Sequence, residues 1–226
     1  DAEHMLEHPM WGLIFEGVPI SHENVFYPRG GHFKNGIDKF DAGFFNISPR
    51  EATYMNPVQR IFLETAWEAI EDAGYGGEKI YGTNTGVYIG YDNTNDLVYK
   101  YFTKNDAMHL TGNWVGIIAS RVSYLFNLTG PSIVTDTACS SGLVCVHQAC
   151  KALKNKECEM VIAGGIQVMQ AGNTVEEGSK NKGMDMVESI DEIAMPFDDN
   201  ANGTVWGEGV GTLLLKPLSK AIADGD

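Results

Sequence analysis

The stretch VTDTACSSG, residues 134–142, decides the fold, because an apolar run there meets a cysteine and then a long segment of helical periodicity. We interpret it as a strand, a sharp turn and a helix, with Cys139 at the turn. The helix is apolar nearly all round at its start and mixed later, with Leu143, Val144, Cys145, Val146, Ala149, Cys150, Ala152 and Leu153. Such a helix is expected to begin deep in a core.

Cys139 lies where a thiol becomes nucleophilic. The unpaired N–H groups and the positive dipole end of the following helix favour the thiolate over the thiol. Ser140, Ser141 and Gly142 are small enough to leave the sulfur accessible. A thiol at the buried end of a helix would be reached through a tunnel, which suits a long, thin substrate. The alternative is an inert buried cysteine, because free cysteine is among the most buried residue types.

Composition limits the classes of function. The 226 residues are 43% hydrophobic and 20% charged, which is typical of a globular domain with a substantial core. A formal charge of −14 argues against a nucleic-acid partner and gives no support for docking on an acidic protein. No signal peptide and no membrane-spanning run is recognisable. The four clustered cysteines show no C-x-x-C pairing, which favours a reducing, cytoplasmic location over a zinc site or a disulfide framework.

The periodicity on both sides of Cys139 predicts alternating strands and helices. Apolar runs predict strands at 86–90, 132–137, 160–169 and 212–216, and apolar spacing predicts helices at 57–73, 114–126 and 218–223. Asn56 is placed to cap the first of these helices, with Pro57 at its first position and Gln59 reaching back as in a capping box. Gly164 and Gly165 suggest a close approach of backbones, and the paired aromatics Phe44 and Phe45 are interpreted as core.

The motif DTACSS, residues 136–141, resembles the active-site motif of β-ketoacyl synthases, particularly the ketosynthase domains of modular polyketide synthases. Further segments resemble the same family in the same order, at 10–18, 37–52, 196–198 and 203–211. The resemblance implies that residues 1–226 are the N-terminal portion of such a domain, without its first strand and its C-terminal half. It implies an α/β, thiolase-like fold, with a mixed five-stranded type of sheet flanked by helices around a central buried helix.

The resemblance also implies a reaction and its partners. An acyl chain would move from the phosphopantetheine thioester of an acyl carrier protein to Cys139, and a decarboxylated malonyl-type extender would then attack it. No bound cofactor is implied, and the strand at 132–137 would form a homodimer. The family's decarboxylation step uses two histidines and a lysine of the C-terminal half. None of the six histidines present matches those positions, so this chain is not expected to complete condensation unaided.

Met108, His109 and Trp114 fall in a region that contributes to the acyl pocket and the dimer contact in the family. They are therefore candidates for shaping substrate choice. Asp92, Asp96 and Asp106 are interpreted as a solvated loop and not as a metal site. Two other functions stay open: a coenzyme-A-using thiolase relative, and a non-condensing module for acyl binding or dimerisation. The DTACSS context and the Gly-Glu-Gly segment at 207–209 argue against the first.

Overall fold

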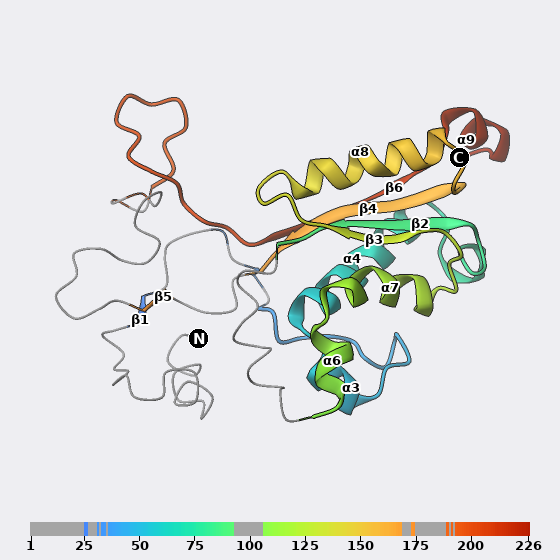
Figure 1. Ribbon diagram of the computed structural model, residues 1–226, viewed down its shortest axis with the longest axis horizontal. Coiled ribbons are helices and arrows are strands. Elements are labelled where there is room, and N and C mark those ends of the chain that lie inside the picture. The colour runs from blue at the N-terminus through green and yellow to red at the C-terminus, as the bar shows by residue number, and fades with distance from the viewer. Residues whose placement is uncertain are drawn as a thin grey trace.

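The computed structural model describes residues 25–26, 31, 33–34, 36–92, 106–168, 173–174, 189, 191 and 193–226. A four-stranded sheet lies at the centre of these residues (Figure 1), in the order β3 (Ser132–Thr135), β2 (Thr85–Gly90), β4 (Met160–Gln167), β6 (Gly209–Leu215). The strands β3, β2 and β4 are parallel, and β6 runs antiparallel to β4. A short antiparallel pair joins β1 (Val25–Phe26) to β5 (Asn173–Thr174).

The two inner strands, β2 and β4, are the ones whose sequences are continuous apolar runs. All six residues of β2 are buried, and so are the first five of β4, because helices cover both faces of the sheet there. The edge strand β6 instead alternates between exposed and half-buried residues. All four predicted strands are present, although β3 ends at Thr135 and β6 begins earlier than predicted, at Gly209.

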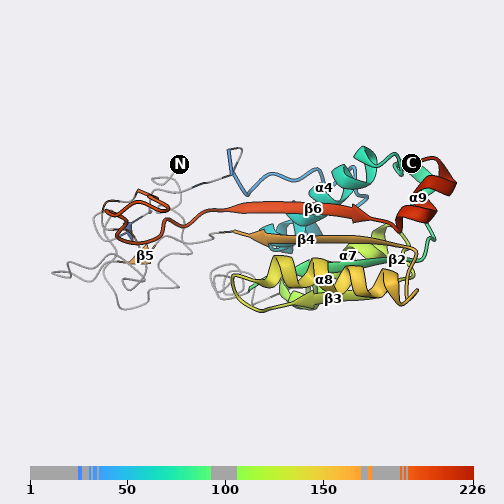
Figure 2. The same ribbon diagram turned by 90° about the horizontal axis from the view of Figure 1, so that it is seen from above.

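Helices lie on both faces of the sheet (Figure 2). On one face, α8 (Ser141–Lys154) packs along β2 and β4. On the other face, α4 (Pro57–Asp72) packs on β6 and α7 (Val115–Leu125) on β3 and β2. The shorter α3 (Pro49–Tyr54) and α6 (Met108–Asn113) pack on each other on the α4 and α7 side, and η2 (Gly77–Lys79) and α9 (Leu218–Asp224) complete the described helices.

The alternation of side chains along the strands divides the core in two. Val87 and Ile89 of β2 belong to the larger cluster, with the side chains of α4 and α7. Tyr88, between them, belongs to the smaller cluster beneath α8. The residues of α8 that are fully buried in that cluster are small, Cys145, Ala149 and Ala152, while Val146 and Leu153 of the same helix pack against it partly buried.

The start of α4 confirms one sequence-based prediction and corrects another. The Asn56 side chain accepts the Val58 N–H at 3.0 Å, and Pro57 is the first helical residue, as predicted. The prediction of a capping box with Gln59 is wrong. The Asn56 N–H does not bond to the Gln59 side chain but donates to the Gly112 carbonyl at 2.9 Å. The Gln59 amide instead donates to the Thr111 carbonyl at 3.1 Å. Since α6 supplies these acceptors, only tertiary packing decides between the two arrangements.

The prediction that α8 begins deep in a core is wrong for its outer face. The helix buries Ser141, Cys145, Ala149 and Ala152, whereas Leu143 is 81% exposed. Among the described residues a single sheet packs against α8, so only one stripe of the helix is covered. The described sheet has four strands and is flanked by helices, in agreement with the expected mixed α/β fold. The segment at 10–18 that resembles the family's first helix lies outside the described residues.

Candidate active site around Cys139

Cys139 lies in a strained turn between β3 and α8. Ala138, the residue before it, has a φ of 53°, in the left-handed region that residues other than glycine seldom adopt. The Ala138 N–H donates to Asp136 Oδ1 at 2.9 Å. The Ser141 hydroxyl donates to the Ala138 carbonyl at 2.6 Å and accepts the Thr137 N–H at 2.8 Å. These bonds hold the strained backbone, and such strain is concentrated at functional sites.

Glycines bring this turn against the ends of two strands. A Cβ on Gly90, the last residue of β2, would lie 2.4 Å from the Ser141 carbonyl carbon. One on Gly165 of β4 would lie 3.3 Å from the Gly142 Cα, and one on Gly164 2.3 Å from the Gly211 carbonyl oxygen. The close approach predicted at Gly164 and Gly165 is therefore confirmed. Cys139 consequently lies at the carboxyl edge of the parallel strands, where ligands bind in open α/β sheets.

The thiol of Cys139 is accessible. Cys139 is exposed and lines a cavity of about 380 Å³, together with residues at the ends of β2 and β4 and around the start of β6. The remaining lining residues are Gly90, Tyr91, Asp92, Ala138, Ser141, Gly142, Gly165, Ile166, Gln167, Trp206 and Gly209. The alternative in which Cys139 is buried is therefore wrong. In the described residues the approach to the thiol is an open cavity and not the expected tunnel.

The buried thiols are two others, Cys145 and Cys158. Burial raises the pKa of both, which favours the unreactive thiol. The Cys145 Sγ donates to the Gly142 and Gly164 carbonyls, at 3.0 Å each. Cys145 therefore has a packing role beneath the turn that carries Cys139.

The backbone at Cys139 offers a hydrogen-bond donor. Ser140 and Ser141 direct their amides back into the turn, to the Thr137 and Ala138 carbonyls at 3.3 and 3.0 Å. Among the described residues, none accepts a hydrogen bond from the Cys139 amide. The thiol and a donor amide on the same residue thus lie beside the cavity, directly before the first turn of α8.

Met108, His109 and Trp114 lie together on and just after α6, yet none of them lines the cavity at Cys139. Trp114 is 66% exposed. The His109 ring lies beside the Asn113 side chain, with 3.5 Å between the two nitrogens. Their proposed influence on substrate choice stays a prediction.

Asp106 has a structural role at the start of α6. Asp106 accepts the Met108 N–H at 2.8 Å and pairs with Arg50 at 2.9 Å, while Asp96 lies outside the described residues. Over the described ranges, no group of three or more potential metal ligands comes together. The helices in those same ranges also include none with the length and apolar character needed to cross a bilayer.

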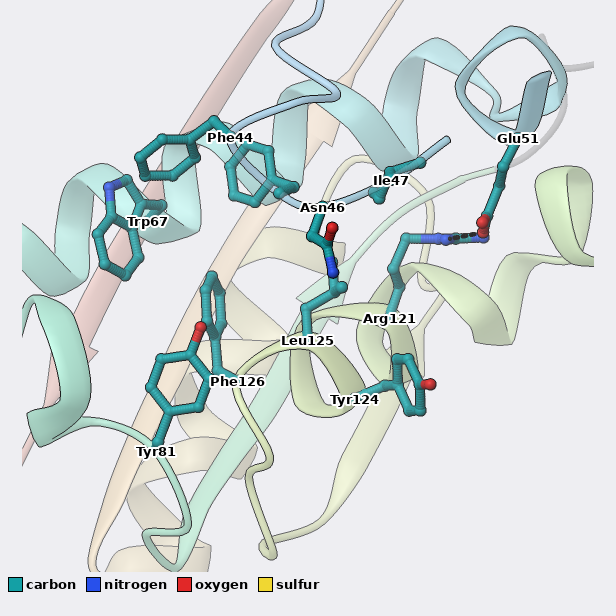
Figure 3. Close-up of a pocket in the computed structure, with 11 residues that line it drawn as sticks. Phe44, Asn46, Ile47, Glu51, Trp67, Tyr81, Arg121, Tyr124, Leu125 and Phe126 are labelled. Carbon is teal, nitrogen blue, oxygen red and sulfur yellow. Dashed lines mark hydrogen bonds and ion pairs between the residues drawn. The ribbon is translucent and has the colours of Figure 1, made fainter. Parts of the chain in front are cut away.

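A second, larger cavity of about 660 Å³ lies on the opposite face of the sheet (Figure 3). Its walls are aromatic, with Trp67 stacked on Phe126 at 5.5 Å between ring centroids. Phe45 is buried as predicted, whereas Phe44 is 56% exposed and forms part of this wall. An ion pair between Arg121 and Glu51 closes one end at 2.6 Å. No cysteine lines this cavity, so the cavity at Cys139 is the candidate active site.

Sequence reasoning missed most of the residues around Cys139. Tyr91 directly follows β2, and Gln167 is the last residue of β4. Their position at the carboxyl ends of parallel strands is a signal that could have identified them. Trp206 gave no such signal, because its approach to the turn depends on the tertiary structure.

Comparison with known proteins agrees with this geometry. Residues 19–221 match the family described as "Beta-ketoacyl synthase, N-terminal domain". The chain is 44% identical over 199 residues to polyketide synthase PksM of Bacillus subtilis and 38% identical over 216 residues to erythronolide synthase EryA2 of Saccharopolyspora erythraea. These alignments cover 88% and 95% of this chain but 4% and 6% of the two relatives.

The fold is similar to solved ketosynthases. The ketosynthase from module 6 of the bacillaene synthase of Bacillus subtilis 168 superposes with a TM-score of 0.70 at 39% identity, over 85% of this chain and 31% of that one. The family match covers most of the chain and includes the turn with Cys139. The chain therefore belongs to the β-ketoacyl synthase family, whose N-terminal domain, with its thiolase-like fold, it contains.

Proposed function

We propose that the chain is part of a carrier-protein-dependent β-ketoacyl synthase of a polyketide or fatty-acid assembly line, with Cys139 as its nucleophile. One observation carries the proposal: Cys139 is exposed at a strained turn before α8, beside a cavity at the carboxyl edge of the sheet. The likeness to polyketide synthases adds support.

The acyl-transfer step follows from this arrangement. The Cys139 sulfur attacks the thioester carbonyl of the phosphopantetheine-bound acyl chain, and its electron pair forms the new carbon–sulfur bond. The Cys139 amide, which has no acceptor among the described residues, donates to the oxyanion that forms. When the intermediate collapses, the bond to the carrier sulfur breaks, and the carrier leaves as a thiol after taking up one proton, which balances the proton lost by the Cys139 thiol. Splitting condensation into two steps lowers the barrier of each.

The condensation step needs groups from a C-terminal half, which in this proposal packs on the open side of α8. The exposed Leu143 supports that contact. We assign homodimerisation to β3, an edge strand paired on one side with β2 and carrying Ile133 at 40% exposure. Met108, His109 and Trp114 would influence substrate choice from the neighbouring surface of α6. The four free cysteines suit the cytoplasm.

The test is acylation of the complete protein by a hexanoyl carrier protein, measured as the mass of the peptide that contains Cys139. We expect the wild type to gain one hexanoyl group, and C139S to lose acylation by a factor on the order of a thousand or more. C150S is the matched control, because Cys150 is an exposed cysteine of α8, the helix that follows Cys139, and should be dispensable.

Two outcomes would favour the other functions. Equal acylation by hexanoyl-coenzyme A and by the carrier protein would indicate a thiolase-type enzyme. An intact fold without any mass gain at Cys139 would indicate a non-condensing module.

A further inference from the structure

Trp206 forms part of the wall of the cavity at Cys139. It precedes β6, and the backbone after it is fixed against an earlier segment. Gly207 forms a bridge with Gly31, and the Glu208 N–H donates to the Gly31 carbonyl at 2.6 Å. The indole is therefore held next to the candidate nucleophile by contacts that do not involve a ligand.

The indole N–H of Trp206 is buried and has no hydrogen-bond acceptor within the described part of the chain. Buried indole N–H groups normally find a partner, and leaving one unpaired costs free energy. The Ser141 hydroxyl, which lines the same cavity, is already engaged with Ala138 and Thr137. Trp206 therefore brings an unused donor, itself covered from solvent, to the wall of the cavity at Cys139.

We propose that Trp206 is a specificity-determining residue, whose indole N–H donates to a carbonyl oxygen of the acyl chain carried on Cys139. This inference rests on the proposed function. A chain with a suitably placed carbonyl would complete the pairing of the indole, whereas a saturated chain would leave the donor buried and unpaired. Sites built to hydrogen-bond a substrate group discriminate against analogues that lack it.

The test compares acylation of Cys139 in the complete protein by hexanoyl, 3-oxohexanoyl and 5-oxohexanoyl pantetheine thioesters. The quantity measured is the rate for the better oxo chain divided by the rate for hexanoyl. We expect this ratio to fall about five- to tenfold in W206F, which retains an aromatic ring without the N–H. W67F is the matched control, because Trp67 lines the aromatic cavity on the other face of the sheet, and its ratio should equal that of the wild type.

The outcomes separate this inference from the proposed function. Absence of acylation of wild-type Cys139 by all three thioesters would contradict the proposed function itself. A ratio in W206F within twofold of the wild-type ratio would overturn the inference and leave the proposed function intact. This includes an equal loss of rate for all three chains, which is expected if Trp206 contacts the pantetheine arm.

A measurement on the wild type keeps the inference testable even if W206F does not fold. The oxo group of the acyl chain is labelled with ¹³C, so that its infrared carbonyl band can be identified. In the folded acyl-enzyme this band should have a lower frequency than in the denatured acyl-enzyme in an aprotic solvent. An unshifted band for both the 3-oxo and the 5-oxo chain would contradict the assigned hydrogen bond.

Discussion

At the scale of single residues, glycines set the distance between the nucleophile turn and the sheet. Gly90 faces the backbone of Ser141 and Gly142, and there is no room for a methyl group between them. The backbone on the other side cannot move away without shifting the start of α8. A close approach of this kind is a tertiary property, and the sequence showed it only as a suggestion from Gly164 and Gly165.

We predict that G90A destabilises the protein by at least about 2 kcal/mol, because overpacking displaces backbone. G116A is the matched control, since a Cβ there would meet nothing within 4 Å and the residue lies in α7. It should stabilise by about 0.5 kcal/mol. Urea unfolding measures both. Similar unfolding midpoints for G90A and wild type would show that the turn with Cys139 can move away from the sheet without loss of stability.

At the scale of elements, polar side chains join α3 and the start of α6 to each other and to the larger helices. Arg121 of α7 donates to Glu51 of α3 at 2.6 Å and to Gln59 of α4 at 2.9 Å. Arg50 of α3 binds Asp106, which precedes α6. None of these partners is recognisable from spacing, because they lie 56 to 70 positions apart in the chain.

Asp106 gives this region a pH dependence. The Met108 N–H, and then the Arg50 guanidinium, lower the pKa of its carboxyl below the ordinary value of 3.8. The unfolded chain therefore binds more protons in acid. The stabilisation is fully present above the unfolded pKa and is lost as the pH falls through the lowered folded pKa.

We predict that D106N flattens the fall in the free energy of unfolding between about pH 5 and pH 2, as measured by urea unfolding at each pH. R50Q should flatten the same region less, because the backbone N–H makes the larger contribution. Superimposable profiles for D106N and wild type would assign the acid sensitivity to other carboxylates.

At the scale of the whole molecule, the described residues leave two surfaces open. One is the outer face of α8 and the other is the free edge of β3. If β3 forms the proposed dimer, a two-fold axis places equivalent residues of the two strands near one another. A charge at Ile133 would then be introduced twice at one contact.

We predict that I133K weakens dimerisation at least about tenfold, as measured by sedimentation velocity of the complete ketosynthase. Ile133 is 40% exposed, so a lysine there should leave the fold intact. L218K is the control, because Leu218 is 75% exposed on α9, away from β3, and its variant should dimerise as the wild type does. An unchanged dimer in I133K would place the interface elsewhere.

The sequence by itself determined the order of the four sheet strands and of α4, α7, α8 and α9, the cap at Asn56 and the position of Cys139 between β3 and α8. These features depend on local periodicity, local turn chemistry and one motif, all of which are readable along the chain. Only the tertiary structure decided that Leu143 faces outward, that Gln59 bonds to α6 and α7, and that Trp206 lies beside Cys139. Those outcomes depend on which distant segments pack together, and hydrophobic patterning specifies that a face is buried without specifying its partner.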